Sequence, residues 1–404
     1  MMRPVDPYAI EVVTSLFPGR GRPEVVRSTG TPDAGTSEWW VLPSRRRARL
    51  LVPAGRPGAA VMLSRHGAGA RNVARGVVAR AVTSGLAARL PLPRLRLGGQ
   101  VAQSELEGVL QRLLGQQIVL GVLMGPPRPN RKPVLQVFGP DGATLAFVKV
   151  GTDPLTSDLV RREAGCLRRV LAGDLKVVQP PRVLHAGPVG GLELLALEPL
   201  ESSQRAGRDS AVAPPLEAMA EVAGSQGVRR ETLSTSRFWL DAASAADAAQ
   251  NPTLRGRVHD VLAQLERRFG AREVVMGSWH GDWAPWNMGT AAGRVQVWDW
   301  ERYSDAVPWG LDAAHFLAQR VRHASPARAE QEQVYRDELP HVLRSAGEHG
   351  PEQDPTIVLL AYLVTICLRF AAAEGGAAPG TPHPRAVWAL DLAERVLAEA
   401  PVQR

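Results

Sequence analysis

The sequence predicts an α+β protein made of three parts: an extra N-terminal α/β segment over residues 1–103, a small antiparallel β-sheet lobe over 104–199, and a largely helical lobe over 200–404. Two observations predict this class. Strand-like apolar runs, a helical pattern and a hairpin turn signal fill the middle part. Beyond it, apolar residues recur mainly at helical spacing. The 404 residues agree with two or three domains, and the 45% hydrophobic content supports a sizeable core.

The N-terminal segment carries three short strand patterns before a longer helical one. The strands are expected at 38–42, 49–52 and 59–63, and the helix at 72–90, where apolar residues repeat on one face. Prolines and glycines just after this helix mark a linker. The order of these elements weakly echoes the unit that follows, and the alternative is a separate small cap or interaction domain.

The middle part begins with a short helix over 104–114. Three strands are predicted after it, at 118–124, 134–138 and 145–150. A Pro-Asp-Gly turn signal separates the last two, as in a β-hairpin. These three strands therefore start a small antiparallel sheet.

A second helix follows the third strand and completes the middle part with two more strands. The helix is predicted over 157–171, with Ser157 or Asp158 as its N-terminal cap. Further strands are expected near 177–184 and 192–197. The order of three strands, one helix and two strands predicts one sheet with one helix packed on it.

The last part is mostly helical. The stretch 201–250 is rich in Ala and Ser and poorly patterned, whereas 254–269 has a clean apolar helical face. Two short strands are expected next, at 273–276 and 295–298, with a loop between them. Helices then fill the chain to about residue 400.

The loop between these two strands collects polar side chains that suit phosphoryl transfer. His280, Asp282 and Asn287 lie in it, and Asp299 ends the second strand. Two carboxylates and an amide supply the oxygen ligands that Mg²⁺ prefers. Phosphoryl transfer needs such a metal beside the phosphates, and a carboxylate that orients the attacking hydroxyl and accepts its proton. The alternative is a loop stabilised by bonds between its side chains and its backbone.

The spacing of these residues resembles the aminoglycoside phosphotransferase family and, through it, the wider group of kinase-like enzymes. The family's H-G-D-x-x-x-x-N pattern is matched from His280 to Asn287, and its D-W-E pattern from Asp299 to Glu301. Asn is scarce in this chain, so its presence at the required position is informative. The resemblance covers about residues 105–400 and implies a bilobal, protein-kinase-like fold.

The resemblance also implies a role for each residue of the loop. It makes Asp282 the catalytic base and lets Asn287 and Asp299 hold Mg²⁺. It makes His280 a brace of the loop. It further implies that Asp312, at the start of the following helix, holds the loop by hydrogen bonds.

A kinase-like fold also needs a cation from the third strand of its small lobe and a Glu on the following helix. Lys149 lies in the third predicted strand, in a chain with very few lysines and many arginines. Glu163 falls on the apolar face of the next helix, where a carboxylate needs a partner. We expect the two to pair and to bind the nucleotide. The alternative is a surface lysine on an edge strand, with Glu163 paired to a nearby Arg such as Arg162.

Two further stretches are expected to contact the nucleotide. The loop 125–132, which should cover the phosphates, is Pro-rich and basic, and this departs from the Gly-rich loop often found in such folds. Basic residues of that loop, Arg131 among them, are candidates for phosphate contacts. The base of the nucleotide is expected at the connector after the fifth strand, at Ala196, Leu197 and Glu198.

We therefore expect an ATP-dependent phosphotransferase that moves the γ-phosphoryl group to a hydroxyl of a metabolite or sugar-like acceptor. Its cofactors would be ATP, or another nucleoside triphosphate, and Mg²⁺. The stretch 201–260 has nearly balanced charges and the whole chain is basic, which favours a neutral or anionic acceptor over a polycationic aminoglycoside. The alternative is a non-catalytic nucleotide-binding or scaffold protein with the same fold.

Composition bears on the other classes of protein. The net charge is +8, but Arg is spread along the chain and no nucleic-acid-binding module is recognisable, so no nucleic-acid partner is expected. Two cysteines make no disulfide framework. The N-terminus lacks the apolar run of a signal peptide, and the longest apolar run, 357–368, is too short to span a bilayer. We expect a cytoplasmic protein without a membrane partner.

Overall fold

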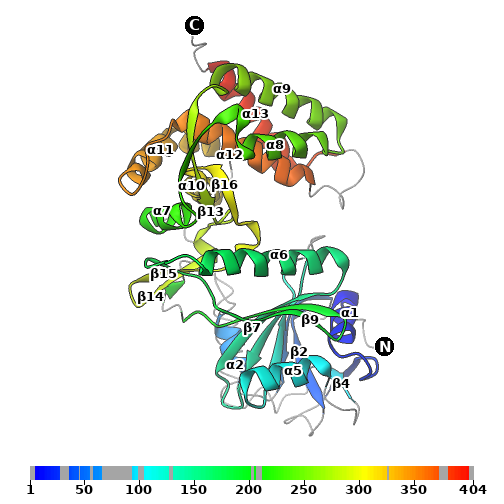
Figure 1. Cartoon of the computed structure of the whole chain (residues 1–404). Helices are drawn as coiled ribbons and strands as arrows, with labels where there is room; N and C mark the ends of the chain where they lie inside the picture. Colours follow the sequence, from blue (N-terminus) through cyan, green and yellow to red (C-terminus); the bar gives the residue numbers. More distant parts are fainter. Residues whose placement is uncertain are drawn as a thin grey trace. The chain divides into compact units, whose positions relative to one another are not determined.

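The chain divides into two compact units, a sheet unit and a helical unit (Figure 1). The sheet unit comprises residues 1–168 and 181–200, and the helical unit comprises 169–180 and 201–404. The structure is a computed structural model that describes residues 5–27, 36–44, 46–54, 58–65, 93–98, 104–126, 131–201, 204–205, 212–324, 327–372 and 381–399. The predicted α+β class, with an antiparallel sheet part and a largely helical part, is confirmed.

The sheet unit is built on one antiparallel sheet, which is larger than the five strands predicted for the middle part. Its nine strands run in the order β1-β4-β2-β3-β5-β6-β7-β10-β9. Their bounds are β1 Glu24–Arg27, β2 Ser37–Ser44, β3 Arg47–Pro53, β4 Pro93–Leu97, β5 Val119–Leu123, β6 Val134–Phe138, β7 Thr144–Gly151, β9 Val183–Val189 and β10 Leu192–Leu197. All five strands predicted between 118 and 197 have counterparts in or beside this sheet.

The first hundred residues share this sheet with the strands that follow them. β3 pairs with β5, with Leu50 opposite Leu123, and the Trp39 indole donates to the Leu120 carbonyl at 2.7 Å. Helix α1 (Pro7–Leu16), capped by Asp6, packs apolar residues into the same core. The described part of the N-terminal segment is thus continuous with the sheet in both hydrogen bonding and packing.

One strand prediction in this segment is wrong. Residues 59–63 lie in helix α2 (Gly58–Arg65), which carries Ala59, Met62 and Leu63 onto a small core with Trp40. The run is short and continuously apolar, and such a run does not distinguish a strand from a buried helix by its periodicity. The helix predicted at 72–90 lies outside the described residues.

The two helices predicted in the middle part are present, and one begins earlier than expected. Helix α5 (Glu105–Leu114) starts at a capping box formed by Ser104 and Glu107. Helix α6 (Pro154–Leu171) is capped by Asp153, whose Oδ1 accepts from the Thr156 amide at 3.0 Å. The predicted caps at 157 and 158 are therefore wrong, because a proline is well suited to the first helical turn and the helix starts there.

The stretch 177–184 was predicted to hold one strand, but it contains β8, in the helical unit, and the start of β9, in the sheet unit. β8 (Val178–Gln179) pairs in parallel with β15 (Arg294–Val297) of the helical unit, whereas β9 joins the large sheet. Two prolines, Pro180 and Pro181, are among the three residues between β8 and β9. Proline has no amide hydrogen to donate to a sheet, which explains the break.

The helical unit contains two small sheets besides its helices. One has the order β12-β13-β16 and the other β11-β14-β15-β8. The strands β14 and β16 are short and were not predicted. The remaining bounds are β11 Gln204–Arg205, β12 Arg229–Thr232, β13 Glu273–Trp279, β14 Met288–Ala291 and β16 Ser304–Pro308.

Helices make up most of this unit. Their bounds are α7 Leu216–Gly224, α8 Arg237–Asp247, α9 Pro252–Phe269, α10 Leu311–Ala324, α11 Arg328–Gly347, α12 Pro355–Ala372 and α13 Pro384–Glu399. By length and composition alone, α12 would be apolar enough to cross a membrane. Most of its side chains are buried, and it packs against α13, α10, α9 and α8, as a core helix does (Figure 1).

Candidate functional site

The loop that carries the H-G-D pattern follows β13 and is held in place through its backbone. Asp312, in the first turn of α10, accepts from the amides of His280 at 2.7 Å and Gly281 at 3.0 Å. Burial raises the pKa of Asp312 to about 7, although both hydrogen bonds act to lower it. Gly281 has a φ of 82°, and a Cβ there would collide with the carbonyl of Arg302. Asp312, a residue outside the loop, thus holds the loop by hydrogen bonds to its backbone, as the resemblance implies.

His280 braces the loop from inside. Its Nδ1 accepts from the Asp282 amide at 3.2 Å, and its Nε2 lies 3.1 Å from the Trp298 carbonyl. These two partners fit a neutral ring with its proton on Nε2. Burial lowers the pKa of His280 to about 4, so the ring is neutral at pH 7. His280 therefore orients the loop and is not its charged group.

Asp282 is held on both of its carboxylate oxygens. The side-chain amide of Asn287 donates to the backbone carbonyl of Asp282 at 2.9 Å and to the Oδ2 of Asp282 at 3.1 Å. On the other side, Nε2 of His315 lies 3.3 Å from Oδ1. The hydroxyl of Tyr362 lies 3.3 Å from Nδ1 of the same ring, so one tautomer satisfies both contacts. Asp282 thus has a fixed orientation, while its side chain stays 42% exposed.

The charge state of Asp282 suits a proton acceptor. Partial burial alone would raise its pKa, but the hydrogen bond from His315 and the nearby charge of Arg369 outweigh it and lower the pKa to about 2. The group is therefore a carboxylate at neutral pH. A hydroxyl that reached it could donate a hydrogen bond to it and transfer a proton as its oxygen reacts.

Asp299 is brought beside Asn287 by the strand pairing of β14 with β15. Met288 pairs with Val297, and the Trp298 amide then donates to the Asn287 carbonyl at 3.1 Å. Asp299 itself has a φ of 68°, a left-handed conformation that is uncommon outside glycine and is often found at functional sites. The two predicted metal ligands therefore lie at the same end of this hairpin.

The donor chemistry of this pair fits Mg²⁺. The Asn287 Nδ2 is committed to Asp282, which leaves its side-chain oxygen to act as a ligand together with the carboxylate of Asp299. Among the described residues, no group of three or more His, Cys, Asp or Glu side chains forms a ready metal cage. Two protein ligands plus substrate phosphates are the usual set for Mg²⁺ in phosphotransferases.

In the sheet unit, Lys149 and Glu163 form a buried ion pair. Lys149 lies in β7 between Val134 of β6 and Leu195 of β10, so its strand is not at an edge. Its Nζ is 2.5 Å from Oε1 of Glu163, and the two residues are 6% and 0% exposed. The alternative of a surface lysine on an edge strand is wrong. The loop-end residue Lys132 also approaches Glu163, at 3.8 Å from Oε2.

The residues expected to bind the nucleotide's base lie in and just after β10, the strand beside β7. Ala196 and Leu197 are buried there, with Ala196 opposite Val148. The Glu198 amide donates to the Arg182 carbonyl at 2.9 Å, so that group is already engaged. Base recognition by these three positions stays a prediction.

The basic loop before β6 is only partly described, because residues 127–130 lie outside the described part. Arg131, which was a candidate for phosphate contact, is engaged elsewhere. Its guanidinium lies over the ring of Tyr8 at 3.8 Å and donates to the carbonyls of Met124 and Ala48. Arg131 anchors the end of the loop to the N-terminal segment.

Several tryptophans surround the loop and serve as packing. Trp279, Trp283, Trp300 and Trp309 are all buried, and Trp300 meets the His280 ring edge-on at 4.6 Å. Trp283 is fully buried and packs against the His280 ring at 5.8 Å, so it does not border an acceptor. Trp286 remains partly exposed.

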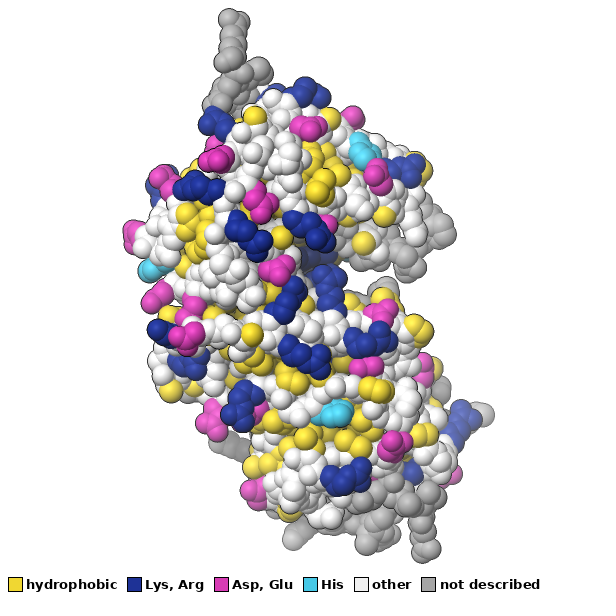
Figure 2. All heavy atoms as spheres, viewed as in Figure 1, with side chains coloured by type: hydrophobic (Ala, Val, Ile, Leu, Met, Phe, Trp, Pro, Cys, Tyr) yellow, Lys and Arg dark blue, Asp and Glu magenta, His cyan; other side chains and the backbone are white. Residues whose placement is uncertain are grey.

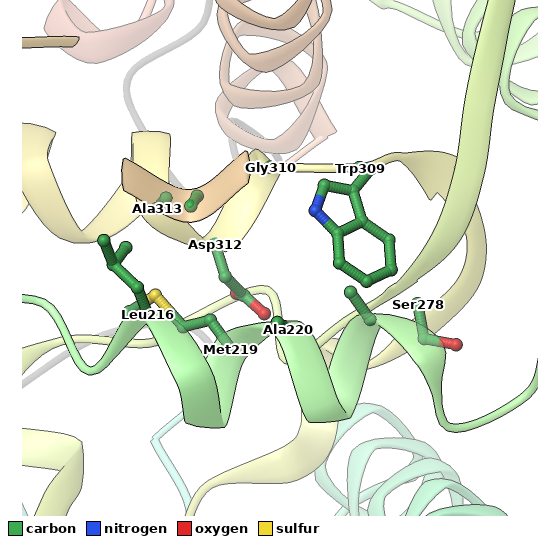
Figure 3. A pocket seen from close by; sticks show the side chains of 10 residues that line it. Leu216, Met219, Ala220, Ser278, Trp309, Gly310, Asp312 and Ala313 are labelled. Carbon is green, nitrogen blue, oxygen red and sulfur yellow. The ribbon is translucent and has the colours of Figure 1, made fainter. Parts of the chain in front are cut away.

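A small cavity lies behind Asp312, between α7 and the start of α10 (Figure 3). Its volume of about 20 Å³ leaves room for a single water molecule. Figure 3 shows the carboxylate of Asp312 directed toward Met219 and Ala220. The cavity is too small for a nucleotide or an acceptor and belongs to the packing that supports the loop.

Three residues near Asp282 were missed as site residues by sequence reasoning: His315, Tyr362 and Arg369. They come from α10 and α12, far along the chain from the loop. One signal was available for His315, since it lies one turn after Asp312 on the same helix. Arg369 also stood out as the charge that ends a long apolar run.

Neither a protein-family model nor a curated protein sequence matches this chain. Solved structures do resemble it. A thermostable mutant of aminoglycoside phosphotransferase APH(4)-Ia in its apo form is 16% identical, with a TM-score of 0.47, over 72% of this chain and 98% of that one. Choline kinase LicA from Streptococcus pneumoniae is 17% identical, with a TM-score of 0.44, over 74% and 100%.

A third similar structure is a choline/ethanolamine kinase family protein from Mesorhizobium loti. It is 15% identical, with a TM-score of 0.42, over 71% of this chain and 90% of that one. A thermostable mutant of APH(4)-Ia has also been solved as a ternary complex with ADP and hygromycin B.

Proposed function

We propose that the protein is an ATP-dependent phosphotransferase that moves the γ-phosphoryl group onto a hydroxyl of a metabolite or sugar-like acceptor. The observation that carries the proposal is the state of Asp282. It is an ionised, partly exposed carboxylate whose two oxygens are fixed by Asn287 and His315. A carboxylate held in this way is pre-organised for one partner at its open side.

In the proposed reaction, Asp282 orients the acceptor hydroxyl and takes its proton. The hydroxyl oxygen forms a bond to the γ-phosphorus as the bond from that phosphorus to the nucleoside diphosphate breaks. His315 holds the Asp282 carboxylate in place, and Asp312 holds the loop by accepting a hydrogen bond from its backbone. Asn287 and Asp299 would hold Mg²⁺, which, when bound, neutralises charge on the phosphates.

The sheet unit contributes a cation for the phosphates of the nucleotide. Lys149 is buried, and a buried ammonium needs an anionic partner. Glu163 supplies one and also fixes the direction of the side chain. A compact point charge of this kind suits a phosphate oxygen.

The proposal is tested by separating nucleotide binding from transfer. We expect Lys149→Ala to weaken binding of ATP·Mg²⁺, measured by calorimetry, by about tenfold or more, because a charged hydrogen bond is lost. We expect Asp282→Asn to bind ATP·Mg²⁺ like the wild type and to lose about a hundredfold or more in transfer to an acceptor found by screening hydroxyl compounds. Asp241→Asn, at an exposed ion pair on α8, is the matched control.

The same measurements decide between the proposal and a non-catalytic nucleotide-binding protein. Binding of ATP·Mg²⁺ without any transfer across the screen would favour the non-catalytic alternative. Transfer that is equal in Asp282→Asn and the wild type would show that the base is another residue.

We also propose a cytoplasmic location, where ATP is available. Both cysteines, Cys166 and Cys367, are buried and form no disulfide. Cysteines outside disulfides are usual in reducing compartments. On the face drawn in Figure 2, Lys and Arg side chains are interspersed with Asp and Glu, and this distribution favours a small-molecule partner over a nucleic acid.

A further inference from the structure

Arg369 lies beside the loop that carries Asp282. It belongs to the last turn of α12, and its guanidinium lies 5.3 Å from the centre of the Trp279 ring. Trp279 is the last residue of β13 and directly precedes His280. Arg369 thus makes a cation–π contact with the residue that directly precedes the loop.

The guanidinium of Arg369 is charged and has no acceptor of its own. Burial and the nearby charge of Arg302 lower its pKa, to about 10, so it stays protonated at neutral pH. Within the described part of the chain, it makes neither a hydrogen bond nor an ion pair, although it carries five N–H donors. The side chain is only partly buried and its nitrogens are not sealed from solvent, so an anion arriving from solution can supply the acceptor.

The nearby carboxylates are already committed to other partners. Asp312 accepts from two backbone amides, and Asp282 is held by Asn287 and His315. Both interact with Arg369 only through their charges. A role limited to neutralising Asp282 would place the two groups in an ion pair, which the structure does not contain.

Two more arginines lie around this position. Arg302 follows Asp299 on the same loop and acts on Arg369, while Arg322 of α10 acts on His315. Arg302 has a carboxylate neighbour, Glu301, at 3.9 Å, whereas Arg369 has none within ion-pair distance among the described residues. Arg369 is therefore the guanidinium near Asp282 that is open to an anionic ligand.

We infer that the acceptor carries an anionic group, a carboxylate or a phosphate, which Arg369 binds while the acceptor's hydroxyl faces Asp282. The inference rests on the proposed function, because it assigns the acceptor of that reaction. An oxyanion would supply the acceptors that the guanidinium lacks, in the paired geometry that arginine favours. A polycationic aminoglycoside would meet repulsion at the same place.

Binding of a simple oxyanion tests the inference without requiring turnover. The probes are sulfate and malonate, titrated by calorimetry at constant ionic strength into protein saturated with ADP·Mg²⁺, so that the nucleotide site is filled. We expect the wild type to bind at least one probe, and Arg369→Gln to bind it about tenfold or more weakly. Arg369→Lys should fall between them. Arg237→Gln, at an exposed ion pair on α8, should match the wild type.

Equal binding by Arg369→Gln and the wild type would overturn the inference, as would no binding of either probe to the wild type. If Arg369→Gln fails to fold, phenylglyoxal modification of the wild type decides. Bound sulfate or malonate should slow modification of Arg369, followed by peptide mass spectrometry, and an unchanged rate would overturn the inference. Failure of the proposed function would appear separately, as loss of ATP binding or as transfer that does not depend on Asp282.

Discussion

At the scale of single residues, the site depends on the way Asp282 is held. The H-G-D-x-x-x-x-N spacing places Asn287 on one oxygen of this carboxylate, and this contact is local in the sequence. The contact on the other oxygen comes from His315, which is itself positioned by Tyr362 of α12. Asp282, the proposed base, is therefore positioned partly by its own loop and partly by two helices that follow it.

Replacement of His315 should change the pH dependence of the reaction. Because the pKa of Asp282 is lowered below its usual value, the base form persists down to acidic pH. His315→Leu removes the donor that lowers it, so the pKa of Asp282 rises and the acid limb of the kcat/KM profile moves to higher pH. A shift of about one unit corresponds to about 1.4 kcal/mol. The measurement is a pH–rate profile.

The control for this change is His259→Leu, because His259 is exposed on α9 and its Nε2 lies 3.1 Å from the exposed Asp247. It should leave the profile unchanged. An unchanged acid limb in His315→Leu, with kcat alone reduced, would mean that His315 stabilises the fold and does not tune the pKa of Asp282.

At the scale of elements, helix α6 shows how a cap supports a functional side chain. Asp153 accepts from the Thr156 amide at 3.0 Å and from its hydroxyl at 2.8 Å. In return, the Thr156 hydroxyl accepts from the amides of Thr152 and Asp153. This fixed start sets the phase of the helix that presents Glu163 to Lys149.

Removal of this cap should lower stability. Asp153→Ala should reduce the free energy of unfolding by about 1 kcal/mol, since an N-cap typically contributes that much. The measurement is urea unfolding followed by circular dichroism. Asp158→Ala is the matched control, because Asp158 was one of the two caps predicted from the sequence and is 69% exposed in the structure. If Asp158→Ala costs as much as Asp153→Ala, the assigned start of the helix is wrong.

The sequence predicted long, periodic elements well. The helix 254–269 and the strands around Lys149 follow from apolar periodicity. The motif spacing grouped Asp282, Asn287 and Asp299, whose catalytic and metal-binding roles stay predictions. Short elements were lost, because a four-residue strand such as β14 carries too little pattern to detect. The contacts by which α10 and α12 position Asp282 could not be predicted either, because no local sequence pattern indicates which helix packs against which loop.

At the scale of the whole molecule, strands from the first hundred residues form part of the large sheet and bury charges within it. Glu38 and Arg94 form a fully buried ion pair at 2.9 Å between β2 and β4. Arg96 adds a second, more exposed partner for Glu38 at 2.6 Å. These charges lie within the sheet that continues through β3 into β5 and on to the strand of Lys149.

Arg94→Met should therefore destabilise the sheet unit strongly. It leaves Glu38 buried with one partner fewer, and breaking a buried pair costs about 3–5 kcal/mol. Chemical denaturation followed by tryptophan fluorescence measures the loss. Arg182→Met, at an exposed pair with Glu198, should change stability by less than about 0.5 kcal/mol. A loss below about 1 kcal/mol in Arg94→Met would show that the pair contributes little.

The pairing of β3 with β5 has a practical consequence for anyone who trims the gene. A fragment that starts near residue 104 would keep the motifs of a minimal phosphotransferase and would look complete by alignment. It would also uncover a row of amide and carbonyl groups along β5, ready to join a neighbouring chain. Inclusion bodies from such a fragment would report the missing neighbour strand, whatever the state of the catalytic loop.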